Sequence, residues 1–356
     1  MAISALAVYA GREAATRLAE RGWDADLFDL LIGASGGPKW FVLSQLDRVL
    51  FSKFLSQRSR PLATLGSSIG SWRHACFATR DPAAAIARME AGYLYQRYSS
   101  ERPSVAEISE VSLGILQNML SDQGAADLLL NDKVHTHVVT ARGRGFAAAS
   151  HPTALASGMG MAALGNAVSR ELLRLSFQRV VFHTGEGIEP PLHFHDFDTC
   201  FTALTADNLI HALHASGAIP FLLTGERNIP GGPPGQYWDG GMIDYHFDLD
   251  QHVSDGLILY PHFSARLVPG WFDKFLPWRQ TAWHRQHKLV LLCPSARFVA
   301  DLPYGKIPDR NDFRGMGEDE RMDYWEICVE RCKALAEEFM ELISGSDPLR
   351  GVTLLD

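Results

Sequence analysis

The sequence predicts an α/β fold with a largely parallel central sheet, and two observations support this prediction. Short, continuous apolar runs bounded by glycine or proline recur along the chain, as is typical of strands buried on both faces. Helix-like segments separate these runs, and strand–helix alternation favours a layered fold with parallel strands. The expected strands are 27–32, 62–66, 134–141, 179–183, 257–260 and 289–293.

Helix signals lie between the expected strands. Asp81 is a favourable N-cap before Pro82, which suits the first position of a helix. Ser104 and Glu107 have the spacing of a capping box at the start of another helix. Near the C-terminus, apolar residues recur at helical steps before Gly345, where a C-terminal cap belongs. These residues are Tyr324, Cys328, Cys332, Leu335, Phe339 and Leu342.

The composition is that of an ordinary globular protein, with 46% hydrophobic and 21% charged residues. The net charge of −8 disfavours a nucleic-acid partner, because such a protein needs a basic surface to neutralise phosphates. The sequence has no internal repeat and no long polar linker, so we expect one domain over residues 1–356. Its motif-bearing core spans about 27–260, and a C-terminal strand and helix extension follows at 261–356.

The cysteines and the N-terminus favour a reduced, cytoplasmic protein. The five cysteines form no C-x-x-C pair, so neither a disulfide framework nor a structural zinc site is expected. The apolar first ten residues lack the basic start of a signal peptide. We predict no metal and no other cofactor.

Segment 145–169 carries no Asp, Glu, Lys or Arg, yet it is too polar for a membrane-spanning helix. Its many small residues would let neighbouring elements approach closely, which predicts a buried helix. A mobile or lipid-touching element is the alternative.

A glycine-rich turn at 33–40 joins an expected strand to a helix-like run. Backbone N–H groups at such a turn, together with the partial positive charge of a helix N-terminus, can hold a phosphate or an oxyanion. A Walker motif is disfavoured because Pro38 separates Gly37 from Lys39, and the dinucleotide-binding fingerprint is absent. A plain tight connection is the alternative.

Residues 66–70 read Gly-Ser-Ser-Ile-Gly, a G-x-S-x-G motif that follows the strand 62–66 and precedes a helix-like run. This strand–turn–helix context is typical of a nucleophile elbow, which exposes its central serine. Ser68 is therefore the candidate nucleophile, and Ser67 should point elsewhere. A serine that only caps the following helix is the alternative.

Asp239, followed by two glycines, is a candidate base for such a serine. The glycines permit a sharp turn that would leave the carboxylate free to face a neighbour. As an isolated tripeptide, Asp-Gly-Gly is more often a plain turn.

Taken together, these motifs resemble those of the patatin-like phospholipase family. In that family, four motifs follow one another along the chain. They are a glycine-rich oxyanion turn, a G-x-S-x-G serine, a small-residue helix that ends near a proline, and Asp-Gly-Gly. This sequence has 35–39, 66–70, 215–220 and 239–241 in the same order, within about residues 27–260. The resemblance implies a three-layer α/β/α patatin-like sandwich and a Ser–Asp dyad that hydrolyses lipid esters.

The resemblance also implies the roles of the site residues. Ser68 would attack the ester and form an acyl-enzyme, with Asp239 as its general base. Gly36 and Gly37 would donate the N–H groups of the oxyanion hole, because Pro38 has no N–H. The acyl group would then pass to water or to another acceptor.

Two further residues of the turn are expected to contact substrate. The family usually shows Gly-Gly-Gly-x-Arg/Lys-Gly, whereas Ser35 here replaces the first glycine and Trp40 the last. Trp40 is bulky and is expected to narrow the cleft. Lys39 could assist an anionic head group or simply support the loop.

The histidines leave alternatives open. His246, His262, His284 and His287 follow Asp239, so a Ser–His–Asp esterase would keep the chain order of an α/β-hydrolase. An acyltransferase and a catalytically inactive lipid-binding protein are further alternatives. The histidine-rich segment 193–198 is expected to be a polar surface loop, with a metal site as the alternative.

Segment 271–288 combines Trp271, Trp278 and Trp283 with four basic residues and one acidic residue. We expect a cap over the cleft, with the tryptophans buried. Tryptophan beside cations also suits a membrane headgroup region, so transient membrane contact by a peripheral protein is one alternative, and nucleic-acid stacking is another. The expected partner is a lipid or a small ester.

Overall fold

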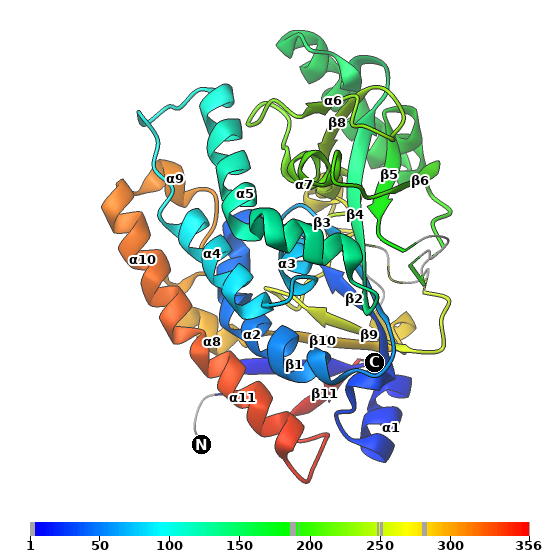
Figure 1. Ribbon diagram of the computed structural model, residues 1–356, viewed down its shortest axis with the longest axis vertical. Helices are drawn as coiled ribbons and strands as arrows, with labels where there is room; N and C mark the ends of the chain where they lie inside the picture. The colour runs from blue at the N-terminus through cyan, green and yellow to red at the C-terminus, as the bar shows by residue number, and fades with distance from the viewer. Residues whose placement is uncertain are drawn as a thin grey trace.

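The computed structural model describes residues 4–185, 190–191, 193–247, 249, 252–279 and 283–355. It is an α/β structure with a mostly parallel central sheet and helices packed against it, consistent with a three-layer sandwich (Figure 1). The strands are β1 Leu6–Ala10, β2 Phe28–Gly33, β3 Leu62–Ser67, β4 Val134–Gly143, β5 Phe177–His183, β6 Thr199–Ala203, β7 Glu226–Arg227, β8 Gln236–Asp239, β9 Leu257–Pro261, β10 Leu289–Pro294 and β11 Val352–Leu354.

The described strands form one sheet in the order β11-β1-β10-β9-β2-β3-β4-β5-β6, with β8 on β4 and β7 on β8. The five strands from β10 to β4 in this order are parallel to one another. All six expected strands are confirmed, each within two residues of its expected bounds. The apolar start of the chain forms β1, which pairs with β10 and β11 and which the sequence analysis did not identify as a strand.

The sheet is mostly parallel, as expected, but β5 runs antiparallel to β4. The physical reason lies in the connection between them. A backbone hydrogen bond of 2.8 Å joins Arg144 N–H to the Ser176 carbonyl, so the connection leaves and re-enters at the same end of the sheet. The chain therefore reverses direction between the two strands.

The helices are α1 Arg12–Arg21, α2 Ser44–Val49, α3 Ile69–Phe77, α4 Pro82–Leu94, α5 Val105–Leu130, α6 Pro152–Val168, α7 Leu209–Gly217, α8 Ala296–Asp301, α9 Asp312–Gly315, α10 Glu318–Arg331 and α11 Lys333–Ser344. Helix α3 packs on β2, β3 and β4, α11 packs on β1, and α4 and α10 lie beside them (Figure 1). The C-terminal helical run expected from the sequence is thus two helices, divided at Cys332.

The expected helix caps are largely confirmed. The Asp81 carboxylate accepts a hydrogen bond from Ala84 N–H, and the Ser104 hydroxyl accepts one from Glu107 N–H. The Glu107 carboxylate, however, accepts hydrogen bonds from Ser99 and not from the Ser104 backbone. The N-cap is therefore present, but the reciprocal bond of a capping box is replaced by a loop contact. Gly345 is the C-cap of α11.

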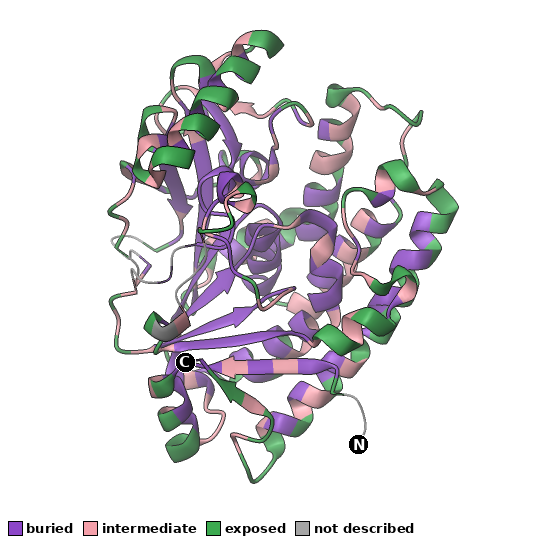
Figure 2. Ribbon diagram, turned by 180° about the vertical axis from the view of Figure 1, so that it is seen from behind, coloured by how far each residue is buried: buried purple, intermediate pink, exposed green. Residues whose placement is uncertain are grey.

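The prediction of a buried helix within 145–169 is wrong. Helix α6 lies in the connection between β4 and β5, and most of it is not buried (Figure 2); its buried residues are Leu155, Gly158, Ala162 and Asn166. Leu164 on its outer side is 74% exposed. Across the described residues, no helix is both long enough and apolar enough to cross a membrane.

The C-terminal segment 261–356 is an integral part of the sheet, because β10 lies between β9 and β1. One hydrophobic cluster contains residues from Ala5 to Leu355 and fills the space between the sheet and the helices. The carboxyl ends of β2 and β3 carry the glycine-rich turn and Ser68, so this core fixes the position of the candidate site.

Candidate active site

Strand β4 brings Ser68 and Asp239 together. In the β3–β4 pair, Ser67 lies opposite Val139, and in the β4–β8 pair the next residue, Thr140, lies opposite Asp239. Ser68 directly follows Ser67, and its hydroxyl donates a hydrogen bond of 2.9 Å from Oγ to Asp239 Oδ2. The two side chains are buried, and Ser68 is 3% exposed and Asp239 5%.

The predicted strand–turn–helix context of Ser68 is confirmed. Ser68 lies between β3 and α3 with φ +54° and ψ −132°, a conformation that costs a non-glycine residue about 1–3 kcal/mol. Gly70 allows α3 to approach β2 closely at this turn. A Cβ atom at this position would lie 2.0 Å from the Gly33 carbonyl oxygen. The turn thus has the backbone strain expected of a nucleophile elbow.

The glycines after Asp239 fix its carboxylate. Gly241 N–H donates a hydrogen bond of 2.7 Å to Asp239 Oδ1, while Oδ2 accepts the one from Ser68. A Cβ atom on Gly241 would lie 2.3 Å from Ser35 Oγ and 3.0 Å from Asp239 Oδ1. The Asp-Gly-Gly turn therefore allows the glycine-rich turn to pack directly against the acid.

Three other serines support this arrangement, and the sequence analysis did not assign them roles. Ser216 Oγ accepts a hydrogen bond from Ser68 N–H and donates one to the Val139 carbonyl. Ser67 points away from the dyad, as expected, and its hydroxyl hydrogen bonds to Ser35 and to the backbone behind the site. These bonds tie the elbow to β4 and to the glycine-rich turn.

The environment of Asp239 makes it more basic than an exposed aspartate. Burial raises the pKa of Asp239 above its usual value near ~3.9. Arg310, the Gly241 N–H, the Ser68 hydroxyl and Lys274 oppose this rise in pKa.

The glycine-rich turn faces the dyad. The N–H groups of Gly36 and Gly37 donate no hydrogen bond to another described residue, so they are free for a ligand. Gly37 has φ +56° and lines the same cavity as Ser68, while Gly36 lines the same cavity as Asp239. Both residues therefore border the cavities that contain the dyad.

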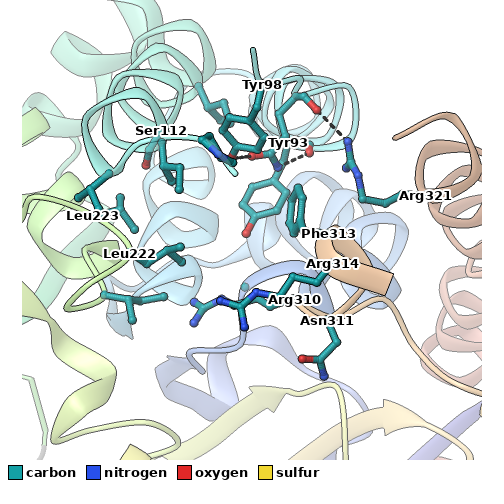
Figure 3. A pocket seen from close by; sticks show the side chains of 18 of the residues that line it. Tyr93, Tyr98, Ser112, Leu222, Leu223, Arg310, Asn311, Phe313, Arg314 and Arg321 are labelled. Atoms are coloured by element: carbon teal, nitrogen blue, oxygen red, sulfur yellow. Dashed lines mark hydrogen bonds between the residues drawn. The ribbon is translucent and has the colours of Figure 1, made fainter. Parts of the chain in front are cut away.

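Two cavities meet at the dyad. The larger, of about 1480 Å³, is lined by Ser68 and by an apolar wall that includes Ile69, Trp72, Leu222 and Leu223. Figure 3 shows Leu222 and Leu223 on one side of it, Phe313 and Arg314 on the other, and Tyr93 and Tyr98 above. The smaller, of about 480 Å³, is lined by Asp239 and by basic residues. Ile219, Arg310 and Asn311 line both cavities.

Of the two residues of the turn that are expected to contact substrate, only one lines a cavity. Lys39 lines the smaller cavity, as expected. The expectation that Trp40 narrows the cleft is wrong, because Trp40 is 1% exposed, stacks on Phe41 and lines neither cavity. The tight 3₁₀ helix from Gly37 to Leu43 turns adjacent side chains in different directions, so Trp40 enters the core.

The candidate histidines do not contact the dyad within the described residues. His246 Nδ1 accepts a hydrogen bond from Val268 N–H, and His262 Nδ1 lies against the Ser264 backbone. Burial lowers the pKa of His246 well below its usual value and that of His262 to about 3, so both are neutral near pH 7. The side chain of His284 lies outside the described residues, and no described hydrogen bond joins His287 to Ser68 or Asp239.

The histidine-rich segment 193–198 is a loop. The His193 and His195 rings stack on one another, and Asp196 forms an ion pair with the buried Arg179. Within the part of the chain that the structure describes, no group of three or more His, Cys, Asp or Glu residues is placed to hold a metal ion.

Segment 271–288 forms a cap only in part. Trp271, Lys274 and Phe275 line the smaller cavity, whereas Trp278 is 69% exposed, against the expectation that it is buried. Residues 280–282 of this segment lie outside the described residues. Sequence reasoning noted Lys274 only as one charge of a basic segment, and it missed Arg310, for which no local pattern gave a signal.

Comparison with known proteins adds no relative of this chain. No family model, no curated protein and no solved structure matches it. A function therefore has to be inferred from the chain's own residues.

Proposed function

We propose that this protein is a serine hydrolase that cleaves carboxylic esters of lipids, with a patatin-like sandwich fold. The observation that carries the proposal is the hydrogen bond of 2.9 Å from Ser68 Oγ to Asp239 Oδ2, at a strained turn between β3 and α3. The order of the motifs along the chain supports the same assignment, as does the mostly parallel sheet.

Asp239 acts as the general base. As Ser68 Oγ attacks the ester carbonyl carbon, Asp239 takes its proton, and the carbonyl oxygen becomes an oxyanion. The C–O bond to the alcohol then breaks, and Asp239 returns the proton to the leaving oxygen. A water molecule attacks the acyl-enzyme with Asp239 again as base, which releases the acid and restores Ser68.

The oxyanion is stabilised by the N–H groups of Gly36 and Gly37. These groups donate to no described residue in the free protein. Loss of one such donor typically costs about 3 kcal/mol of transition-state stabilisation.

A Ser–Asp dyad is supported over a Ser–His–Asp triad. Both Asp239 carboxylate oxygens are occupied by Ser68 and Gly241, while His246 and His262 are neutral and bonded elsewhere. Two alternatives remain, namely transfer of the acyl group to an alcohol and an inactive lipid-binding protein. The experiment with p-nitrophenyl esters below distinguishes both from a hydrolase.

We further propose that an apolar surface at α6 contacts a lipid bilayer. Met161, Leu164 and Val168 lie at helical steps on one side of α6, a helix without any charged residue. Arg279 donates a hydrogen bond to the Asn166 carbonyl, which brings the exposed Trp278 beside the C-terminal end of α6. The α6 surface consists of the exposed side chains of Met161, Leu164, Val168, Leu175, Phe275 and Trp278.

Two features favour an anionic bilayer as the occupant of the α6 surface. Arg174 is exposed and precedes Leu175, and Arg279 donates to the Asn166 carbonyl near the end of α6, so both would complement acidic head groups. Phe275 also lines the smaller cavity, so the surface is continuous with the mouth of the site.

Hydrolysis of short p-nitrophenyl esters tests the catalytic proposal. Ser68→Ala and Asp239→Asn should each lower kcat/KM by at least ~1000-fold, because each removes a reacting group. The controls Ser56→Ala and Asp207→Asn change exposed residues that line neither cavity and should stay within about 3-fold of the wild type. Full activity of either dyad variant, with its fold verified by circular dichroism, would contradict the proposal. Wild-type ester cleavage that requires an added alcohol would instead identify an acyltransferase.

A further inference from the structure

Three basic side chains converge on the smaller cavity without an anionic partner. Lys39, Lys274 and Arg310 line it together with Asp239. None of the three makes a hydrogen bond or an ion pair with another described residue. Instead, Lys39 Nζ lies 4.9 Å from the centre of the Phe263 ring, and Lys274 Nζ lies 3.5 Å from that of Tyr245.

The cluster is assembled from three segments that are distant in the sequence. Lys39 comes from the glycine-rich turn, Lys274 from the cap segment, and Arg310 from the loop before α9. Arg310 packs against that turn, because a Cβ atom on Gly37 would lie 3.0 Å from Arg310 Nε. The three positive charges are thus positioned by the same elements that position the dyad.

The acidic neighbours do not neutralise the cluster. Asp239 accepts hydrogen bonds from Ser68 and Gly241 on its two oxygens. Asp309 also lines the cavity, but it forms an ion pair of 3.3 Å with Lys306. A positive excess therefore remains in the cavity.

This excess is unfavourable in the free protein. Burial, together with the charges of Lys39 and Arg310, lowers the pKa of Lys274 to about 7, although Asp239 opposes the shift. The pKa of Lys39 is lowered as well, because burial outweighs the opposing charge of Asp309 and Arg310 adds to the effect. A bound anion would relieve the repulsion among the three cations and favour the charged form of the two lysines.

We infer that the smaller cavity binds an anionic group, a phosphate or a carboxylate, on the alcohol portion of the substrate. The inference rests on the proposed function, since it places the acyl chain along the apolar wall of the larger cavity and the ester between the two. Ser68 faces the larger cavity and Asp239 the smaller, so the bond to be broken would lie at their junction. A cavity of about 480 Å³ suits a small head group such as a glycerol phosphate.

Calorimetric binding of sn-glycerol 3-phosphate, glycerol and inorganic phosphate to the full chain tests the anion site without any need for catalysis. Glycerol phosphate should bind, glycerol should not, and inorganic phosphate should bind more weakly than glycerol phosphate. Lys274→Met and Arg310→Met should each weaken the binding of glycerol phosphate by about 10- to 100-fold, because each removes a charged hydrogen-bond donor. The control Arg266→Met removes an exposed charge outside both cavities and should leave this binding unchanged.

Three outcomes would overturn the inference: no binding of glycerol phosphate, equal binding by the Met variants, or binding of inorganic phosphate as tight as that of glycerol phosphate. The last would indicate a site for a free anion and not for a group of the substrate.

A matched pair of substrates then separates this inference from the proposed function. We expect kcat/KM for a 1-acylglycerol 3-phosphate to exceed that for the 1-acylglycerol with the same chain by at least about 10-fold. In Lys274→Met and Arg310→Met this ratio should fall toward one, whereas Arg266→Met should keep it. Hydrolysis of both esters with the same ratio in every variant overturns the anion site and leaves the hydrolase proposal in place. Binding of glycerol phosphate without hydrolysis of any ester overturns the hydrolase and retains the anion site.

Discussion

Ser68 and Asp239 are separated by 171 positions in the sequence, yet their side chains are 2.9 Å apart. Two consecutive residues of β4, Val139 and Thr140, account for this contact, since one pairs with the strand before Ser68 and the other with Asp239 itself. The strand that precedes Ser68 and the strand that ends at Asp239 are therefore both paired with β4. Such support holds a reacting pair in its working geometry without movement of a loop.

The glycine at the start of α3 is predicted to be essential for this geometry. In Gly70→Ala, the new Cβ would lie 2.0 Å from the Gly33 carbonyl oxygen, and neither backbone segment can move without disturbing β2 or α3. We expect the free energy of unfolding to fall by about 1–3 kcal/mol, measured by chemical denaturation.

A matched glycine-to-alanine substitution in α6 should have the opposite effect on the free energy of unfolding. Gly160→Ala introduces a Cβ with no atom within 4 Å, in the middle of a helix. Its free energy of unfolding should rise by about 0.5–1 kcal/mol, because alanine loses less backbone entropy on folding. Equal effects of the two substitutions would contradict the close packing described for Gly70.

The sequence predicted six of the eleven described strands, because strands buried on both faces have continuous apolar sequences. It did not predict the reversal at β5, which depends on how a long connection closes and not on the composition of the strand. It also failed for α6, whose small apolar residues have the same composition whether they pack inside a protein or lie on its surface. Local sequence pattern thus identified these six strands but not the environment of every helix.

The same contrast holds for the site. Ser68, Asp239 and the glycine-rich turn could be found because each lies in a short motif with a backbone requirement. Arg310 could not, because no motif surrounds it and only the tertiary fold brings it to Gly37. Trp40 was misplaced because a motif position does not give the direction of the side chain within a tight 3₁₀ helix.

The acid limb of the pH–rate profile should reflect the ionisation of the Asp239 carboxyl group. Burial raises the pKa of this carboxyl, and the base must be ionised, so kcat/KM for a neutral ester should fall as the pH drops through a value above ~3.9. Among the groups that oppose the rise, Arg310 has the largest effect. Arg310→Met should therefore move the acid limb to higher pH, while Arg266→Met should leave it in place. A shift to lower pH in Arg310→Met would contradict this assignment of the base.

Anion binding should weaken as the pH rises through 7. Lys274 has a pKa of about 7 in the free protein, so it is charged below this pH and progressively neutral above it. From pH 7 to 9, where a phosphate monoester is mostly dianionic, the affinity for glycerol 3-phosphate should decrease. In Lys274→Arg this decrease should be largely absent, because a guanidinium stays charged. Identical pH profiles of the two proteins would exclude Lys274 as the titrating group.

Vesicle flotation tests the α6 surface. The wild type should float with vesicles that contain anionic lipid, and Trp278→Ala or Leu164→Ser should lower the bound fraction severalfold, because each removes an apolar side chain that the bilayer would bury. Ile327→Ser removes an exposed apolar side chain from α10 and is the matched control. Equal flotation of all four proteins, or none by the wild type, would exclude this surface as the membrane contact.

Covalent labelling with a fluorophosphonate tests the central claim most directly, because the reagent modifies only a serine whose hydroxyl is activated as a nucleophile. Mass spectrometry of the labelled chain should show one adduct, peptide mapping should assign it to Ser68, and Asp239→Asn should slow the labelling strongly. An unlabelled protein, or an adduct on another serine that forms equally fast in Asp239→Asn, would contradict a nucleophile at Ser68 activated by Asp239.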